Sequence, residues 1–348
     1  TIKKMAIAYT GGTQNQTELQ EIQREIYSDW GTFRDLDIDI SEGHKSGTDV
    51  YESSVAVGMK AYTGAAVSAG SDSLSVSKSS VTTTKVEFSD LIDYNSLLDT
   101  RFERSMAKGA FNTVSNEFDN AVLQQITPAI SQTIENDIWN GATTATKAAI
   151  AALTPGAAQG SISAGAQTLI SAAPTNLIDS LPTVILHNDS NAKVTPGAGL
   201  GDYKKVLNIA TIDASSIAAE YAKLYGTLDP KVLANEKVVI FAPLAHRQLM
   251  MIANNSVGAA SNKNFVFSGE GMDSKAFYNG IEVKFKPLEG FIIAAPSKYL
   301  KILMDLAGDV SRLEVDKQAN GSDFYYYKNV QAFATWCTNQ RYITLYGG

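Results

Sequence analysis

The clearest hydrophobic pattern in the chain predicts one long helix over residues 116–141. Large apolar side chains recur there at every fourth position: Phe118, Val122, Ile126, Ile130, Ile134 and Ile138. The spacing is helical, and it slightly exceeds the 3.6-residue turn, so the apolar stripe drifts around the helix and suits several contacts along its length. Gly141 offers a helix-ending residue. Pro128 leaves two alternatives, a kink in one helix or a second helix with Thr127 as its cap.

A different pattern precedes this helix in residues 51–88, which are rich in Ser, Thr and Val. Apolar and polar positions alternate in "SLSVSKSSVTTTKVEF", and turn residues gather between Gly70 and Asp72. We predict two strands joined there as a β-hairpin. The segment holds few large apolar residues, and an isolated two-stranded hairpin is marginally stable in water, so we expect it to need a supporting partner.

Residues 1–50 are predicted to form a polar arm with one short helix. Thr17 and Gln20 have the spacing of a capping box. The apolar stripe of this helix is narrow, and it comprises Leu19, Ile22, Ile26 and Trp30. Such an arm has too little apolar surface to fold by itself, so we expect these four residues to dock the arm on another surface.

The rest of the chain mixes helical and strand patterns without a regular alternation. Residues 142–212 are rich in Ala, Ser, Thr and Gly, with short helices predicted near residues 147–153 and a buried strand in "PTVILHND". Asp213 is placed to cap a helix whose apolar face includes Tyr221. The run "KVVIFAP", residues 237–243, predicts a buried strand, and Pro243 then opens a helix. The strand-rich final third completes an α+β architecture.

Composition and charge narrow the range of functions. The chain has 348 residues and a net charge of −7, so it gains nothing from counterion release on DNA, and nucleic-acid binding is not expected as its primary task. The length permits two domains. A single cysteine, Cys337, rules out an internal disulfide and a paired-cysteine metal site, and we expect its thiol to be buried and inert. Neither a membrane-spanning run nor a signal-peptide core is apparent.

No motif in the sequence predicts catalysis. The three histidines, His44, His187 and His246, do not have metal-ligand spacing, and each is expected at the surface. No serine lies in a GxSxG motif, and "GAGLG" at residues 197–201 has the character of a surface loop. Glu135 and Asp137 are two residues apart and so point to different faces of the predicted helix. We therefore predict no catalytic, cofactor-binding or metal site.

Several segments resemble, in order, the major capsid proteins of tailed bacteriophages, whose fold is shared with herpesvirus capsids and encapsulin shells. The hairpin resembles the extended loop of that family, and "TTTKVEFSDLIDYNSLLDT" (82–100) its return strand. "TIENDIWNG" (133–141) resembles the usual ending of its spine helix, "KVVIFAPLAHRQLMMI" (237–252) its axial domain, and "SDFYYYKNVQAFATWCTNQRYITLY" (322–346) its closing strands. The likeness covers roughly residues 50–348. Pro128 and the long Ala/Ser-rich stretch 142–212 depart from it.

The resemblance implies a division of the chain into four parts. These are an N-terminal arm (1–50), an extended loop (51–88), a peripheral domain with the spine helix (89–141 and 300–330) and an axial domain (142–299 and 331–348). It also implies that the hairpin lies on a neighbouring subunit. The hairpin residues that would make that contact are Lys60, Tyr62, Gly64, Gly70, Asp72 and Lys78.

The function implied is that of a structural, non-enzymatic subunit of an icosahedral capsid. Such a subunit would assemble in the host cytoplasm into pentamers and hexamers, and the resulting virion shell would enclose double-stranded DNA without sequence-specific binding. Portal, scaffold and decoration proteins are the other candidate partners, and no membrane or cofactor is implied. An encapsulin-like nanocompartment shell that packages a cargo enzyme is the alternative with the same fold. A hydrolase with scattered catalytic residues is a third reading, which the missing motifs disfavour.

Overall fold

The computed structural model describes twelve segments of the chain: residues 31–34, 38–44, 48–55, 74–93, 116–155, 162–190, 204–206, 212–256, 264–268, 275–305, 312–317 and 324–347. Helices and mixed sheets both occur, so the predicted α+β class is correct. Two compact units divide the chain. The first unit comprises Thr1–Lys45, Thr83–Glu135 and Leu303–Phe333, and the second comprises Ser46–Thr82, Asn136–Ile302 and Ala334–Gly348.

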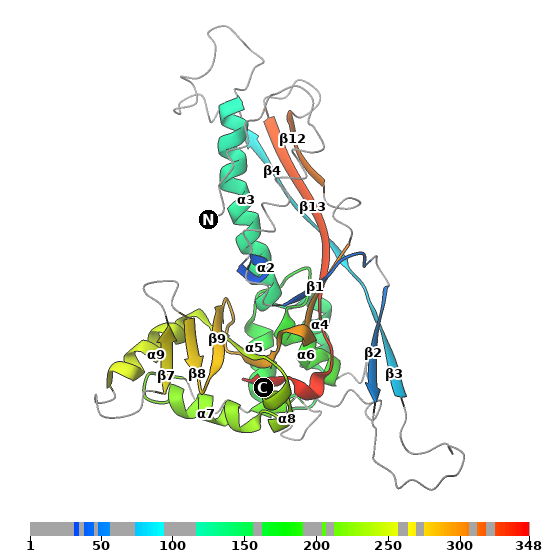
Figure 1. Cartoon of the computed structure of the whole chain (residues 1–348). Helices are drawn as coiled ribbons and strands as arrows, with labels where there is room; N and C mark the ends of the chain where they lie inside the picture. The colour runs from blue at the N-terminus through cyan, green and yellow to red at the C-terminus, as the bar shows by residue number, and fades with distance from the viewer. Residues whose placement is uncertain are drawn as a thin grey trace. The chain divides into compact units, whose positions relative to one another are not determined.

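The longest elements of the described chain lie mostly in the first unit, and the last residues of α3 and of β13 belong to the second (Figure 1). They are helix α3 (Asn116–Trp139), strand β13 (Phe324–Cys337) and strand β4 (Thr84–Asp93). β4 pairs with β13 along its whole length, from Thr84 opposite Phe333 to Asp93 opposite Phe324. The remaining strands of this five-stranded sheet are β1 (Asp39–Ser41), β11 (Leu300–Met304) and β12 (Arg312–Lys317). The unit also holds the short helix α2 (Gly31–Arg34).

Helix α3 is continuous through Pro128, so the alternative of two separate helices is wrong. The Pro128 side chain is exposed, which places its ring on the solvent side of the helix. Of the apolar stripe, Ile130, Ile134 and Ile138 are buried and Ile126 is half-buried. The side chains of Phe118 and Val122 lie outside the described part. The helix ends at Trp139, two residues before the predicted limit.

The second unit is built on a seven-stranded mixed sheet in the order β5-β14-β10-β6-β9-β8-β7. In that order the strands are Lys204–Val206, Thr344–Tyr346, Ile292–Pro296, Val238–Pro243, Ile281–Lys286, Lys275–Tyr278 and Phe265–Ser268. The pairs β14/β5 and β6/β9 are parallel, and the others are antiparallel. All six residues of β6 are buried, in agreement with the predicted buried strand at 237–243.

The described part of the second unit also contains the helices α4 (Thr144–Ala151), α5 (Ala164–Ala172), α6 (Leu181–Ser190), α7 (Ile217–Thr227), α8 (Pro230–Asn235) and α9 (Leu244–Ser256). The 3-10 turns η4 (Ser297–Tyr299) and η5 (Gln340–Tyr342) are further described elements of the second unit. The core lies between the sheet and helices α7 and α9, where Tyr221, Ile240 and Met250 are fully buried.

One element differs in type from the prediction. Residues 181–190 form helix α6, whereas the sequence predicted a strand there, and His187 therefore lies on a helix. Leu181 to Leu186 are buried without a break, so the apolar run carries no period that could tell a buried strand from a buried helix.

The predicted hairpin consists of β2 (Thr48–Val55) and β3 (Leu74–Val81), joined by residues outside the described part. The eight pairs run in register from Thr48 opposite Val81 to Val55 opposite Leu74. β2 and β3 form a two-stranded sheet to which no third described strand is added. Val50 and Val81 are buried near the open end of the hairpin.

Candidate functional site

The loop that follows α3 is held tightly by its neighbours in the second unit. Gly141 has a φ of +108°, a conformation that L-residues rarely adopt. A Cβ atom there would lie 2.1 Å from Nδ2 of Asn176, so glycine is required sterically as well. The Asn176 side-chain amide donates to the Asn140 carbonyl at 2.8 Å, and the Asn176 backbone N–H donates to the Ala142 carbonyl at 3.0 Å.

A partly buried carboxylate network continues from this loop. Asp179 accepts from the backbone N–H of Thr143 and from the hydroxyl of Thr146, each at 2.7 Å. The Thr183 hydroxyl donates to the Gly141 carbonyl at 2.9 Å. Each of these bonds satisfies a backbone or side-chain group at the start of α4 or the end of α3, so the network fixes the path of the chain between the two helices.

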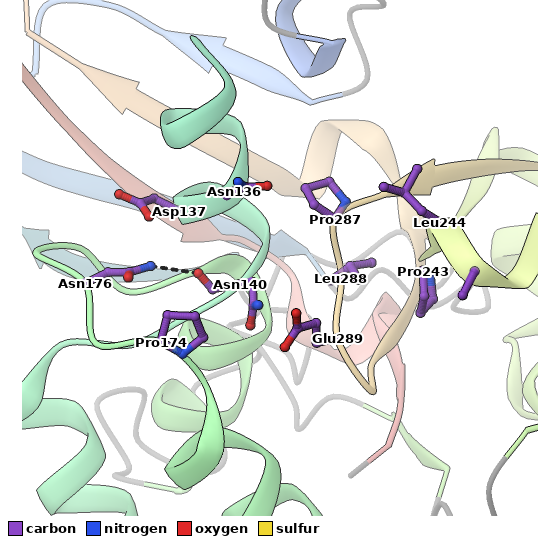
Figure 2. Close-up of a pocket in the computed structure, with 11 residues that line it drawn as sticks. Asn136, Asp137, Asn140, Pro174, Asn176, Pro243, Leu244, Pro287, Leu288 and Glu289 are labelled. Carbon is purple, nitrogen blue, oxygen red and sulfur yellow. Dashed lines mark hydrogen bonds between the residues drawn. The ribbon is translucent and has the colours of Figure 1, made fainter. Parts of the chain in front are cut away.

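A pocket of about 400 Å³ lies beside this loop (Figure 2). Its polar lining comprises Asn136, Asp137, Asn140, Asn176 and Glu289. Three prolines, two leucines and an alanine supply the rest of the lining, and no basic side chain is among these described residues. In Figure 2 Asp137 and Asn176 lie at one end of the group, Pro243 and Leu244 lie at the other, and Leu288 and Glu289 lie between them.

Asp137 is the pocket residue with the most unusual electrostatics. Burial raises the pKa of its carboxyl from 3.8 to about 6, because desolvation disfavours the charged form. The residue lies in the last turn of α3, where the helix dipole also favours cations over anions. That turn contains no basic side chain.

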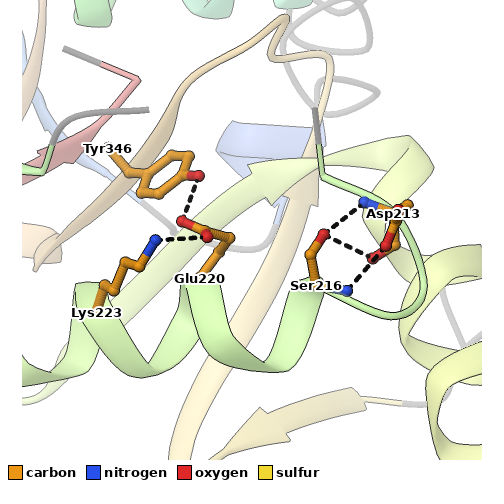
Figure 3. Close-up of polar contacts among 5 residues, drawn as sticks. All are labelled: Asp213, Ser216, Glu220, Lys223 and Tyr346. Atoms are coloured by element: carbon orange, nitrogen blue, oxygen red, sulfur yellow. Dashed lines mark hydrogen bonds and ion pairs between the residues drawn. The ribbon is translucent and has the colours of Figure 1, made fainter. Parts of the chain in front are cut away.

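A second polar cluster joins α7 to the C-terminal strand (Figure 3). Glu220 accepts from the Tyr346 hydroxyl at 2.7 Å and from Nζ of Lys223 at 2.6 Å. Burial would raise the pKa of Glu220, but the bonds from Lys223 and Tyr346 outweigh it and leave the pKa lowered. The carboxylate thus stays charged and ties β14 to α7, which is a structural arrangement.

Asp213 acts one turn before α7, as Figure 3 also shows. Its carboxylate accepts from the Ser215 hydroxyl at 2.6 Å and from the backbone N–H groups of Ser215 and Ser216 at 2.8 Å. These bonds, led by that from the Ser215 hydroxyl, lower the pKa of Asp213 from 3.8 to about 2. Asp213 therefore caps the turn that leads into α7, close to the role predicted for it.

The expectation that all three histidines lie at the surface is wrong for His246. This side chain is 7% exposed on α9, and its Nδ1 lies 3.2 Å from the Tyr221 hydroxyl. Burial lowers the pKa of His246 from 6.5 to about 4, so the ring is neutral at physiological pH. His246, Met250 and Ala253 follow a helical i, i+4, i+7 stripe, which was the available sequence signal for its burial. Cys337 is buried and free of disulfides, as predicted.

The structure describes only some of the residues predicted to contact neighbours. Lys78 lies on β3 opposite Tyr51. Lys60, Tyr62, Gly64, Gly70 and Asp72 lie outside the described residues, as do the arm residues Leu19, Ile22, Ile26 and Trp30. The pocket beside α3 was not predicted, because its lining comes from four separate stretches of sequence without a common motif.

Neither a metal site nor a membrane span emerges from the described segments. No group of three or more His, Cys, Asp or Glu side chains in those segments is placed to hold a metal ion. Among the described helices, none combines the length and apolar character needed to cross a bilayer.

Comparison with known proteins gives structural likenesses only. No protein-family model and no curated protein matches the chain. A solved structure titled "Satellite phage P4 procapsid including size determination (Sid) protein" has a TM-score of 0.49 and 10% identity, covering 94% of this chain and 98% of that one. "Capsid of native GTA particle computed with C5 symmetry" has a TM-score of 0.48 and 12% identity, covering 99% and 94%. "Asymmetric unit of bacteriophage PhiM1 mature capsid" has a TM-score of 0.45 and 8% identity, covering 89% and 85%.

The titles of the three solved structures name one procapsid and two capsids. Their identities of 8–12% and TM-scores below 0.5 carry no residue-level correspondence to this chain.

Proposed function

We propose that this protein is a structural subunit of an icosahedral virus capsid. In this proposal the subunits assemble into pentamers and hexamers and form the shell that encloses double-stranded DNA. The parts of the chain are an arm (1–50), an extended loop (51–88), a peripheral domain (89–141 and 300–330) with α3 as its spine helix, and an axial domain (142–299 and 331–348). The compact units change near residues 135, 302 and 333, close to three of these limits.

The observation that carries the proposal is the β2–β3 hairpin. It has eight paired positions, a length of about 26 Å, yet it forms a sheet of two strands within the described chain. A two-stranded sheet of this kind is marginally stable by itself. A repeating shell resolves the difficulty, because each hairpin can lie across an adjacent subunit and the same contact is repeated around the particle.

The length of the elements and the net charge support the same proposal. Helix α3, with 24 residues, spans about 36 Å, and β13, with 14, spans about 46 Å. Elements of this length suit the subunit of a thin shell wall better than a compact enzyme. A net charge of −7 also suits a container for DNA, because a basic lining would bind the genome and oppose its release.

Negative-stain electron microscopy of the expressed full chain tests the proposal directly. We expect closed shells, or hexameric and pentameric rings. A monodisperse monomer at high protein concentration, without rings in any buffer that permits folding, would contradict it.

The strand register allows a sharper test of the hairpin. Excising residues 53–76 and joining Glu52 to Ser77, which are paired in the structure, through an Asn-Gly turn shortens the hairpin without shifting its register. We expect a soluble, cooperatively melting subunit that no longer forms particles, measured by circular dichroism and sedimentation.

A matched control removes only residues 56–73 and joins the paired residues Val55 and Leu74 by the same turn. This variant keeps all eight strand pairs. Normal particles from the longer excision would refute the role of the hairpin, and comparison of the two variants shows whether the strands or the connecting residues make the contact.

A further inference from the structure

The short helix α2 is bound to α3 through one carboxylate. Glu135 of α3 accepts from the Thr32 hydroxyl at 2.6 Å and from the Thr32 backbone N–H at 3.2 Å. The two residues are 103 positions apart in the sequence, and Thr32 is 0% exposed. Both residues belong to the first unit, and Figure 1 shows α2 beside α3. We call these two hydrogen bonds the Thr32 clasp.

The Thr32 clasp supplies a partner that α2 does not have within itself. α2 has four residues, and its first turn contains no acidic side chain. Isolated helices shorter than about 12 residues are marginal in water, and the first backbone N–H groups of a helix have no partner inside it. Glu135 accepts from one of these groups, and a carboxylate acceptor makes a stronger hydrogen bond than a neutral one. The helical turn and the clasp therefore depend on each other.

The next described segment, residues 38–44, is attached in a different manner. Strand β1 lies beside β11 in the sheet of the first unit, and Ile38, just before β1, is buried. After β1, the His44 backbone N–H donates to the Met304 carbonyl at 2.9 Å. This attachment uses backbone groups and a buried apolar side chain, whereas the two hydrogen bonds of the clasp end on a single side chain. A contact of the second kind opens at a lower cost in free energy than a strand inside a sheet.

We propose that residues 31–34 form a releasable latch, which opens at the Thr32 clasp while β1 and the rest of the first unit stay folded. Residues 1–30 are covalently attached to α2, so the closed latch tethers this part of the chain to α3. When the latch is open, the nearest described attachment is that of residues 38–44. The latch is a property of the single subunit and does not depend on the proposed shell function.

Amide hydrogen exchange in the full-length, unassembled subunit tests the latch. Glu135→Ala removes both hydrogen bonds of the clasp and should accelerate exchange in residues 31–34 by about tenfold or more, because the open state becomes more populated. Exchange in β1 should not change. Thr32→Val removes only the hydroxyl and should accelerate exchange in residues 31–34 by a smaller factor. Gln132→Ala, at an exposed side chain on the same helix, is the matched control and should change nothing.

A double-mutant cycle separates the direct clasp from unrelated effects of the substitutions. Thr32→Val should cause no further acceleration when it is added to Glu135→Ala, because the partner of the hydroxyl is already absent. Additive effects of the two substitutions, or unchanged exchange in residues 31–34 of Glu135→Ala, would overturn the proposal. Equal acceleration in β1 and β13 would also overturn it, since the segment would then open only together with the whole unit.

The test does not depend on a single variant. If Glu135→Ala does not fold, Thr32→Val decides alone: acceleration confined to residues 31–34 supports the latch, and unchanged exchange there overturns it. A protein that forms no particles yields the same exchange data, so failure of the shell function and failure of the latch are distinguishable.

Discussion

The first and second units achieve burial in different ways. In the second unit the central strand β6 consists of six buried residues, Val238–Pro243, and helices α7 and α9 add Tyr221 and Met250 to the same apolar core. In the first unit one face of β13 carries Phe333 together with Asn329 and Gln331, which are 0% and 1% exposed. Amides thus occupy positions that an ordinary core would fill with apolar side chains.

The buried amides of the first unit are only partly satisfied. Gln331 donates to the Asn329 side-chain oxygen at 2.8 Å, while Nδ2 of Asn329 and Oε1 of Gln331 have no partner among the described residues. Exchanging the oxygen and nitrogen positions of both amides would still leave one donor and one acceptor unmatched. The backbone ladder of β4, β13 and β12 offsets this cost, because it depends on peptide groups and not on side chains. The first unit therefore depends more on backbone hydrogen bonds between long strands, and the second unit depends more on apolar side-chain packing.

The largest expected effect tests the packing of the second unit. Phe241 is fully buried, and its ring centroid lies 5.0 Å from that of Trp139. Phe241→Ala should lower the free energy of unfolding by about 3–5 kcal/mol, because it removes a buried aromatic ring and leaves a cavity. Chemical denaturation measures the loss. Phe267→Ala, at a half-buried ring on the edge strand β7, is the matched control and should cost clearly less.

The corresponding test in the first unit concerns Ile134 on α3, which is 0% exposed. Ile134→Ala should destabilise the subunit by about 2–4 kcal/mol. The exposed neighbour Thr133→Ala should change stability by much less, since it removes only a hydroxyl that bonds back to the Ala129 carbonyl. Equal melting of Ile134→Ala and the unsubstituted protein would show that α3 does not contribute to the core of the first unit.

The next largest expected effect is a pH dependence of the free energy of unfolding, which arises from His246 in the second unit. In the unfolded chain His246 takes up a proton near pH 6.5, whereas in the folded chain its lowered pKa delays protonation to about pH 4. The free energy of unfolding should therefore fall by about 2–3 kcal/mol as pH drops through this window. His246→Gln should flatten the dependence between pH 6.5 and 4 in denaturation curves. An unchanged slope in this variant would assign the acid sensitivity to other groups.

Protonation of Asp137 should raise the stability of the folded state over nearly the same pH range in which protonation of His246 lowers it. Its folded pKa of about 6 exceeds the ordinary value of 3.8, so the folded state binds the proton more tightly and gains stability as pH falls from about 6 to 4. After allowance for solvent screening, Asp137→Asn should gain about 1–2 kcal/mol at pH 8 and nothing at pH 4. In the double variant His246→Gln with Asp137→Asn, the free energy of unfolding should change little between pH 6.5 and 4.

The smallest expected effect comes from replacing the buried amide pair of the first unit, Asn329 and Gln331. Replacing both amides, Asn329→Leu with Gln331→Met, keeps the volumes and removes the unmatched polar atoms. We expect a gain in stability of about 1 kcal/mol, because buried polar groups without partners cost free energy. Gln331→Met alone should destabilise, since the Asn329 side chain then loses its hydrogen bond from Gln331. If the double variant is also destabilised, the amides have a function that their hydrogen bonds do not reveal.

Patterns with a strong period were sufficient to predict several elements. The fourfold spacing of apolar residues predicted α3 to within two residues. The alternation in residues 73–88 predicted one strand of the hairpin, which the structure divides into β3, paired with β2, and β4, paired with β13. The strand and helix at 237–252 also agree with β6 and α9. In each case the side-chain period and the boundary residues point to the same element, which is when local sequence is informative.

The failures share a physical cause. Residues 184–186 lie in a continuous apolar run, so hydrophobicity could not distinguish helix α6 from a strand, although Ser180 followed by Pro182 is a helix-start signal. The pocket was not predictable, because Asp137, Asn176 and Glu289 meet only through tertiary packing. His246 shows that an ionisable residue in an apolar stripe can be buried in its neutral form.

Asn254 on α9 has a consequence for the behaviour of concentrated protein. Strand β7 is an edge of the second unit's sheet, and edges of this kind recruit other strands into aggregates. The Asn254 amide donates to the Phe265 carbonyl at 2.7 Å and its oxygen accepts from the Phe265 N–H at 3.4 Å, in the manner of a neighbouring strand. An incoming chain finds these two groups already engaged. One side chain thus occupies the backbone N–H and carbonyl of Phe265, so that an incoming strand cannot pair with this residue.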